Sequence, residues 1–254
     1  MKTLYRLLAR PAILTCLLLT AGAACAQTNL VVNGGFEQGS GSGFYAAYGL
    51  NTFNGFAPTG WLASSTYYGN LVVSQTAANP YSNDWGGVGV ATDFQLTTPD
   101  GGNFVIADTD RTEAPAYSGE IAQQINGLAI GQSYTLTFYQ ASSGKYQAKG
   151  ASVQTTQWDV TFGDSTQVSP LMTAAYNTST PWEKVTMSFT ATSTSQLLSF
   201  FGNGSPGGTP VIMAAIDGVS LTAAMPVPEP ATWGMTLLGV AVIGAFVSTR
   251  RRQS

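Results

Sequence analysis

A run of carboxylates in the middle of the chain is the first feature that could do chemistry. It contains one base, Arg111, and its acidic members are Asp100, Asp108, Asp110, Glu113 and Glu120. Glycoside hydrolysis needs two carboxylates about 5 Å or about 6.5–9.5 Å apart, and Asp108 and Asp110 could share one face of a strand. Calcium ligation is a second use for such oxygens. The third interpretation is a solvated acidic loop at the end of a sheet, and it needs no chemistry.

Aromatic side chains in polar, glycine-rich segments are the second such feature. Sugar rings present apolar C–H faces that pack on aromatic planes, while amide and carboxylate groups bond their hydroxyls. We expect Trp61 to be buried, and we name Tyr67, Tyr68 and Trp85 as candidate glycan-binding residues. In the alternative, the rings cover small cores of their own loops. The full set is Tyr45, Tyr48, Phe53, Phe56, Trp61, Tyr67, Tyr68, Tyr81 and Trp85.

The composition excludes several classes of site. The chain contains no histidine, and its two cysteines, Cys16 and Cys25, lie in the first 26 residues. Ser-His-Asp triads, Cys-His pairs and the common zinc and haem sites are therefore excluded. Between residues 27 and 226, 12 carboxylates stand against four bases, which leaves a net charge of −8. A field of that sign disfavours binding to nucleic acid and to anionic membrane surfaces.

Alternating apolar and polar residues predict that residues 27–225 form one antiparallel β-sandwich. The clearest strand is 133–141, where Tyr134, Leu136 and Phe138 would face the core. Many short strands separated by turns, with no amphipathic helix of three turns, are typical of a sandwich. We expect a long loop over 39–60. The other expected strands cover 29–32, 71–74, 104–107, 121–125, 157–162, 183–190, 197–201, 211–216 and 219–221.

The C-terminal residues 226–254 have parts in a set order. Pro228, Glu229 and Pro230 form a short stiff element, because proline fixes φ and donates no backbone hydrogen bond. The uncharged run 231–249 follows. As a helix it would be about 28 Å long, just enough to span a hydrocarbon core about 30 Å thick. The run therefore predicts a transmembrane helix.

Three arginines, Arg250, Arg251 and Arg252, end that run. Arginines beside a span stay on the cytoplasmic side, so the body should lie on the far side. A Pro-Glu-Pro motif, a single span and a terminal arginine cluster together resemble the PEP-CTERM sorting signal of Gram-negative bacteria. The resemblance implies that an exosortase recognises this tail and cleaves or exchanges it near the Pro-Glu-Pro motif during export.

The N-terminus agrees with export. A basic start, an apolar run and the small residues Ala24 and Ala26 predict a signal peptide over residues 1–26 that signal peptidase removes. The alternative is a lipoprotein acylated at Cys25, although Gly22 stands where Leu or Val is wanted.

Short phrases of the body follow one recognisable order. They are NLVVNGGFE at 29–37, Trp61, IAQQ at 121–124, GQSYTL at 131–136, Trp182-Glu183, and IDGVSL at 216–221. This order resembles the galactose-binding-like jelly rolls, which include many carbohydrate-binding modules and DUF642-type domains. The resemblance implies two facing sheets with the first and last strands close together. It also implies a structural Ca²⁺ between Glu37 and Asp217. Backbone carbonyls would then complete the six to eight oxygens that the ion needs. In the alternative, both are ordinary turn residues.

These features together predict a non-enzymatic protein of the cell envelope or extracellular space. It would be anchored transiently by its C-terminal helix and would bind glycan or belong to an exopolysaccharide or biofilm matrix. Exosortase and signal peptidase would be its partners during export, polysaccharide its ligand, and structural Ca²⁺ its only bound ion. One alternative is a carboxylate-dependent glycan-active enzyme. The other is a purely structural surface protein without a specific ligand.

Overall fold

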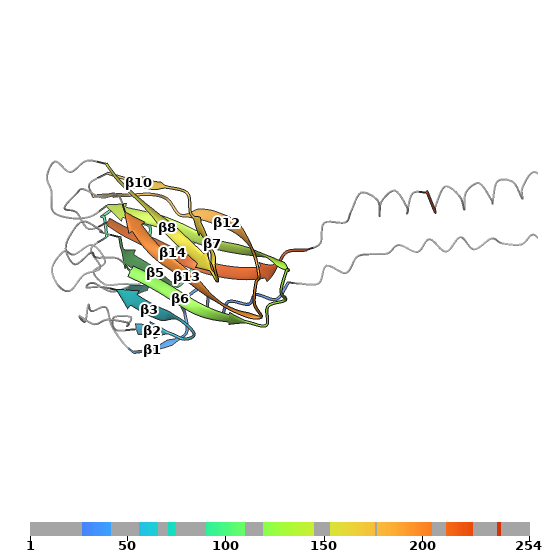
Figure 1. The fold of residues 1–254 in the computed structure, drawn as a ribbon. Coiled ribbons are helices and arrows are strands. Elements are labelled where there is room, and N and C mark those ends of the chain that lie inside the picture. The colour runs from blue at the N-terminus through green and yellow to red at the C-terminus, as the bar shows by residue number, and fades with distance from the viewer. Residues whose placement is uncertain are drawn as a thin grey trace, which may run out of the picture.

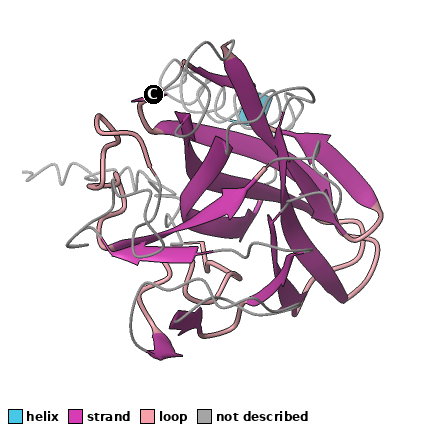
Figure 2. Ribbon diagram, turned by 90° about the vertical axis from the view of Figure 1, so that its left-hand side faces the viewer, coloured by secondary structure: helices cyan, strands magenta, loops and turns pink. Residues whose placement is uncertain are grey.

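The computed structural model describes residues 27–41, 56–65, 71–74, 90–109, 119–144, 153–175, 177–204, 212–225 and 238–239. Within these residues the chain forms two six-stranded sheets and one two-stranded sheet, and every pairing is antiparallel. The two large sheets face each other as the layers of a sandwich (Figures 1 and 2). The predicted all-β, two-sheet architecture is therefore confirmed.

One large sheet, which we call the β8 sheet, is centred on β13 (Ser195–Gly204), which pairs with β8 (Gln154–Phe162) on one side and with β6 (Gly119–Asn126) on the other. The edge strand β9 (Ser165–Val168) pairs only with β8. In spatial order the other strands are β10 (Met172–Ala174), β8 (Gln154–Phe162), β13 (Ser195–Gly204), β6 (Gly119–Asn126) and β3 (Leu62–Ser65).

The facing sheet, which we call the β7 sheet, is centred on β7 and β14. The strand β12 (Glu183–Thr190) pairs with β7 beside β11. In spatial order the other strands are β11 (Thr178–Ser179), β7 (Ser133–Gly144), β14 (Ile212–Ala223), β5 (Asn103–Asp108) and β4 (Leu71–Ser74). The two-stranded sheet pairs β1 (Gly39–Gly41) with β2 (Phe56–Pro58).

The core lies between the two large sheets and consists of the side chains that alternation placed inward. Leu136 and Phe138 of β7 are fully buried, as are Trp158 and Phe200 of the β8 sheet. The Phe200 ring meets Phe138 edge-on at a centroid distance of 5.2 Å, and Trp158 at 6.3 Å. Each such side chain contributes about 1.5–3 kcal/mol through burial, so this contact holds the layers together.

The first expected strand, 29–32, is not a strand. The Asn29 side chain accepts hydrogen bonds from the backbone of Val31 and of Leu221, so it takes the place of a regular ladder. The segment nevertheless lies along β14, because the Leu30 amide donates to the Leu221 carbonyl at 2.9 Å. The resemblance implied that the first and last strands lie close together. The first segment does lie beside β14, although it is not a strand of the sheet.

Three further expectations need correction. The segment 39–60 was expected to be one loop, but its ends pair as β1 and β2. The short strands β3, β9, β10 and β11 were missed. The two strands expected at 211–216 and 219–221 are one strand, β14, with an irregularity between Asp217 and Ser220. Gly218 has a φ of +58°, a conformation that a non-glycine residue rarely adopts, and this φ allows the chain to bulge and continue.

The predicted targeting segments lie outside the described residues, apart from Leu238 and Gly239, which are helical. In the described part of the chain, no helix is long and apolar enough to cross a membrane.

Candidate functional site

Three carboxylates, Glu37, Asp100 and Asp217, surround the backbone of Gly35, and we call this group the acidic site. A Cβ atom placed on Gly35 would lie 2.9 Å from Oδ2 of Asp100, 3.9 Å from Oδ1 of Asp217 and 4.0 Å from Cγ of Glu37. Glu37 follows the turn after the first segment, Asp100 belongs to the segment 90–102, and Asp217 lies at the bulge of β14. The site therefore joins three distant parts of the chain, and it brings together both residues of the implied calcium pair.

Asp217 is the most constrained member of the acidic site, since its side chain is fully buried. Its Oδ2 accepts a hydrogen bond from the Thr98 hydroxyl at 2.5 Å. Its Oδ1 has no hydrogen-bond partner within the described residues. The pKa of Asp217 is raised from 3.8 to about 7, chiefly because the carboxyl group is buried. Hydrogen bonds from Thr98 and the Gly218 amide oppose the rise, and the nearby carboxylates of Asp100 and Glu37 contribute to it. This carboxyl group therefore needs a proton or a cation to be stable inside the protein.

Glu37 is held by the loop that begins β5. Its Oε1 accepts a hydrogen bond from the Asn103 amide, and the Asn103 side chain donates to the Phe36 carbonyl at 3.2 Å. Gly102 has a φ of +77°, and a Cβ atom on it would lie only 1.9 Å from Oε1 of Glu37. Glycine is therefore required at position 102 both by its backbone conformation and by the space that Glu37 occupies.

The chemistry of the acidic site fits Ca²⁺, because its side-chain ligands are carboxylate oxygens and one of them, Oδ1 of Asp217, is buried without a hydrogen-bond partner among the described residues. No three His, Cys, Asp or Glu side chains are close enough to hold a metal ion by themselves in the part of the chain that the structure describes. Carboxylates alone therefore do not complete the site. Backbone carbonyls would have to supply the remaining oxygens, as the resemblance to galactose-binding-like jelly rolls implies.

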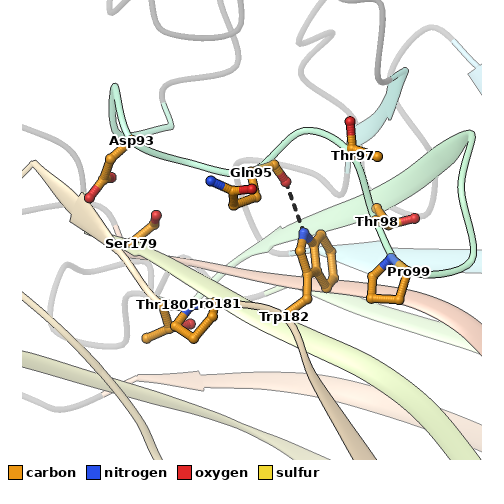
Figure 3. Close-up of a pocket in the computed structure, with 9 residues that line it drawn as sticks. All are labelled: Asp93, Gln95, Thr97, Thr98, Pro99, Ser179, Thr180, Pro181 and Trp182. Carbon is orange, nitrogen blue, oxygen red and sulfur yellow. Dashed lines mark hydrogen bonds between the residues drawn. The ribbon is translucent and has the colours of Figure 1, made fainter.

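A hollow of about 570 Å³ lies outside the β7 sheet, and we call it the Trp182 hollow. Figure 3 shows the Trp182 indole standing at the start of β12 beneath the segment 90–102. Its Nε1 donates to the Gln95 carbonyl at 2.8 Å. The residues that line the hollow are Asp93, Gln95, Thr97, Thr98, Pro99, Ser179, Thr180, Pro181 and Trp182.

The hollow and the acidic site share the residue Thr98. Thr98 lines the hollow, its hydroxyl donates to Asp217, and the same oxygen accepts from the Gly101 amide at 2.8 Å. Because one side chain belongs to both, a change in the acidic site can move a wall of the hollow.

Of the residues singled out from the sequence, Trp61 is confirmed as buried, and its Nε1 donates to the Asn33 carbonyl at 3.0 Å. Asp108 is 2% exposed on β5, while its expected partner Asp110 lies outside the described residues. The candidate glycan-binding residues and the sorting residues also lie outside the described residues. They are Tyr67, Tyr68, Trp85, Pro228, Glu229, Pro230, Arg250, Arg251 and Arg252.

Three residues of these sites were missed or placed elsewhere. Asp100 was assigned only to the acidic run, and Thr98 and Trp182 had no site role. Trp182 could have been found from the sequence, because Pro181-Trp182 directly precedes an alternating strand and so places a large ring at the start of that strand. Nothing in the sequence indicated that Thr98 would face Asp217, 119 residues away.

Comparison with known proteins finds a sorting motif in the C-terminal tail and distant structural similarity for the body. No curated protein matches this chain in sequence. Among solved structures, TmCBM61 in complex with β-1,4-galactotriose is 16% identical with a TM-score of 0.42, covering 78% of this chain and 99% of that one. The CBM22-1 xylan-binding domain of Paenibacillus barcinonensis Xyn10C is 14% identical with a TM-score of 0.35, covering 81% and 100%.

A third similar structure is the K1 cleaved adhesin domain of Lys-gingipain from Porphyromonas gingivalis W83. It is 13% identical with a TM-score of 0.41, covering 75% of this chain and 96% of that one. These TM-scores are all below 0.5, so the description of the body as a β-sandwich rests on its own strand pairing. Residues 226–252 match the PEP-CTERM protein-sorting motif, which implies an exported protein that is sorted to the cell surface and processed by an exosortase.

Proposed function

We propose that this chain is a non-enzymatic protein of the cell envelope or extracellular matrix whose sandwich binds polysaccharide. The sorting motif at 226–252 carries the proposal, because a motif of this kind implies export and sorting to the cell surface, where the body would meet polysaccharide. Signal peptidase removes residues 1–26, the helix 231–249 anchors the chain until processing, and residues 27–225 form the part that is displayed or released.

One observation supports a binding role rather than catalysis. Asp108, one half of the carboxylate pair that the sequence offered for hydrolysis, is almost completely buried. A glycosidase needs both carboxylates of its pair to reach the substrate. The alternative of a glycan-active enzyme predicts that reducing ends appear when the protein is incubated with polysaccharide, and the binding proposal predicts none.

We also propose a structural Ca²⁺ at the acidic site, held by Asp217 and Glu37, with backbone carbonyls supplying the remaining oxygens. When bound, the ion would supply positive charge to Asp217 and link the first segment to the last strand. The unpaired Oδ1 of Asp217 supports this assignment.

The sorting proposal is tested by Glu229→Ala. Glu229 stands between two prolines, and its charge and rigid presentation are what a processing enzyme would read. We expect the variant to fold and be exported but to keep its C-terminal segment, as measured by mass spectrometry of the envelope fraction. Asp164→Ala, in an exposed turn of the body, is the control. Normal processing of Glu229→Ala would remove the assignment.

The binding proposal is tested by affinity electrophoresis of the full chain, purified in mild detergent, against a panel of polysaccharides. Tyr68 and Trp85 remain candidate contacts. We expect wild type to be retarded by at least one polysaccharide and the double variant Tyr68→Ala/Trp85→Ala to be retarded less. Retardation by none would favour the purely structural alternative.

A further inference from the structure

We propose that the Trp182 hollow is a subsite for a neutral sugar chain. This inference rests on the proposed polysaccharide binding and names the place and the charge class of the ligand. Its volume of about 570 Å³ lies within the ~300–1,000 Å³ usual for small-molecule sites. The hollow is therefore large enough for a short stretch of a sugar chain rather than for a single ion or water cluster.

The lining of the hollow has the two kinds of group that a sugar needs. The Trp182 indole and the rings of Pro99 and Pro181 offer apolar surface for the C–H faces of a pyranose. Asp93 and Gln95 are exposed and offer carboxylate and amide groups to the hydroxyls. In Figure 3 these lining residues come from two separate segments, 93–99 and 179–182.

The charge of the lining selects a neutral ligand. Neither Lys nor Arg is among the described residues that line the hollow, and its one charged member is Asp93. An anionic sugar such as a uronic acid would meet this carboxylate without a cation to pair with. A neutral hexose or pentose unit meets no such penalty, since its hydroxyls can donate to Asp93.

The indole is held in place before any ligand arrives. Trp182 contacts Phe104 edge-on at a centroid distance of 5.5 Å and Phe94 at 5.9 Å. Its Nε1 is bonded to the Gln95 carbonyl, so the ring orientation is fixed from both the strand and the covering segment. An aromatic platform fixed in this way loses little entropy on binding.

The test is isothermal titration of neutral oligosaccharides, such as galactan and xylan fragments, into the full chain in mild detergent. Trp182→Ala removes the platform, and we expect a loss of affinity of about 30-fold, the usual effect of truncating a central aromatic contact. Because that variant also opens the Phe94–Phe104 cluster, Asp93→Ala/Gln95→Ala provides a second measurement at two exposed side chains. There we expect about a tenfold loss, the equivalent of one lost hydrogen bond to a charged group. The matched control is Gln124→Ala, an exposed amide on the β8 sheet.

The outcomes separate this inference from the proposed function. Wild-type binding that survives in both hollow variants would overturn the subsite while leaving polysaccharide binding intact. No binding of any neutral or acidic polysaccharide by wild type would overturn both. Tighter binding of a uronic acid oligomer than of a neutral one, lost in Asp93→Ala/Gln95→Ala, would place a ligand in the hollow but contradict the neutral class.

Discussion

The acidic site and the Trp182 hollow are built against the same segment, 90–102, yet they differ in burial and charge. The acidic site places Asp217 fully inside the protein beside two other carboxylates. The hollow keeps Asp93 and Gln95 exposed around one fixed indole. Exposed polar groups remain hydrated and cost the fold almost nothing, whereas a buried carboxylate destabilises the fold unless something neutralises it. The comparison therefore separates a region that controls stability from a region available to a ligand.

The largest expected effect concerns pH and the carboxyl group of Asp217. Its pKa is raised from 3.8 to about 7, so the folded protein keeps the proton over a range in which the unfolded chain has lost it. This contribution is fully present below about pH 4 and is lost as pH rises through 7, with a total of about 4 kcal/mol. We predict that metal-free wild type loses this amount relative to Asp217→Asn between pH 4 and pH 8. Urea unfolding of both proteins in chelator measures it, and parallel pH profiles would contradict it.

The next effect concerns the space beside Glu37. Gly102→Ala combines a φ of +77° with a clash against Oε1 of Glu37, so we expect a loss of about 2–4 kcal/mol. Gly101→Ala is a close control, since its φ of +84° is similar but nothing lies within 4 Å of the added Cβ. We expect about 1 kcal/mol there. Equal losses in the two variants, measured by urea unfolding, would show that Glu37 is not held as the structure has it.

A smaller effect is expected at the residue that joins the two regions. Thr98→Val removes the hydroxyl that donates to Asp217 and accepts from the Gly101 amide, and we expect about 1–3 kcal/mol of destabilisation. Thr97→Val is its exposed neighbour and should leave unfolding unchanged. If Thr98→Val lowers the affinity for sugar by more than its loss of folding stability explains, Thr98 couples the acidic site to the Trp182 hollow.

The smallest effect is expected in the hollow itself. Asp93→Ala and Gln95→Ala should each change the unfolding free energy by no more than about 0.5 kcal/mol, because both side chains are exposed. Thermal unfolding measures this. A loss of several kcal/mol would show that the hollow is part of the core and would remove the contrast between the two regions.

Local pattern and long-range assembly were not equally predictable from the sequence. Alternation identified β7, β8 and β12 with the correct inward faces, because one buried face fixes the register of a strand. The acidic site depends on three separated segments, and residue spacing carries no sign that Asp100 joins Glu37 and Asp217. The resemblance to galactose-binding-like jelly rolls supplied two of the three carboxylates, Glu37 and Asp217. The failed strand at 29–32 shows the opposite limit, since the Asn29 side chain competes with the ladder in a way that apolarity alone does not indicate.

The most direct test of the account is the melting temperature of the full chain at pH 7 with Ca²⁺ and with chelator, compared with Asp217→Asn. If the acidic site holds a cation that ties the first segment to β14, Ca²⁺ will raise the melting temperature of wild type and leave that of Asp217→Asn unchanged. Identical wild-type melts with and without Ca²⁺ would contradict it.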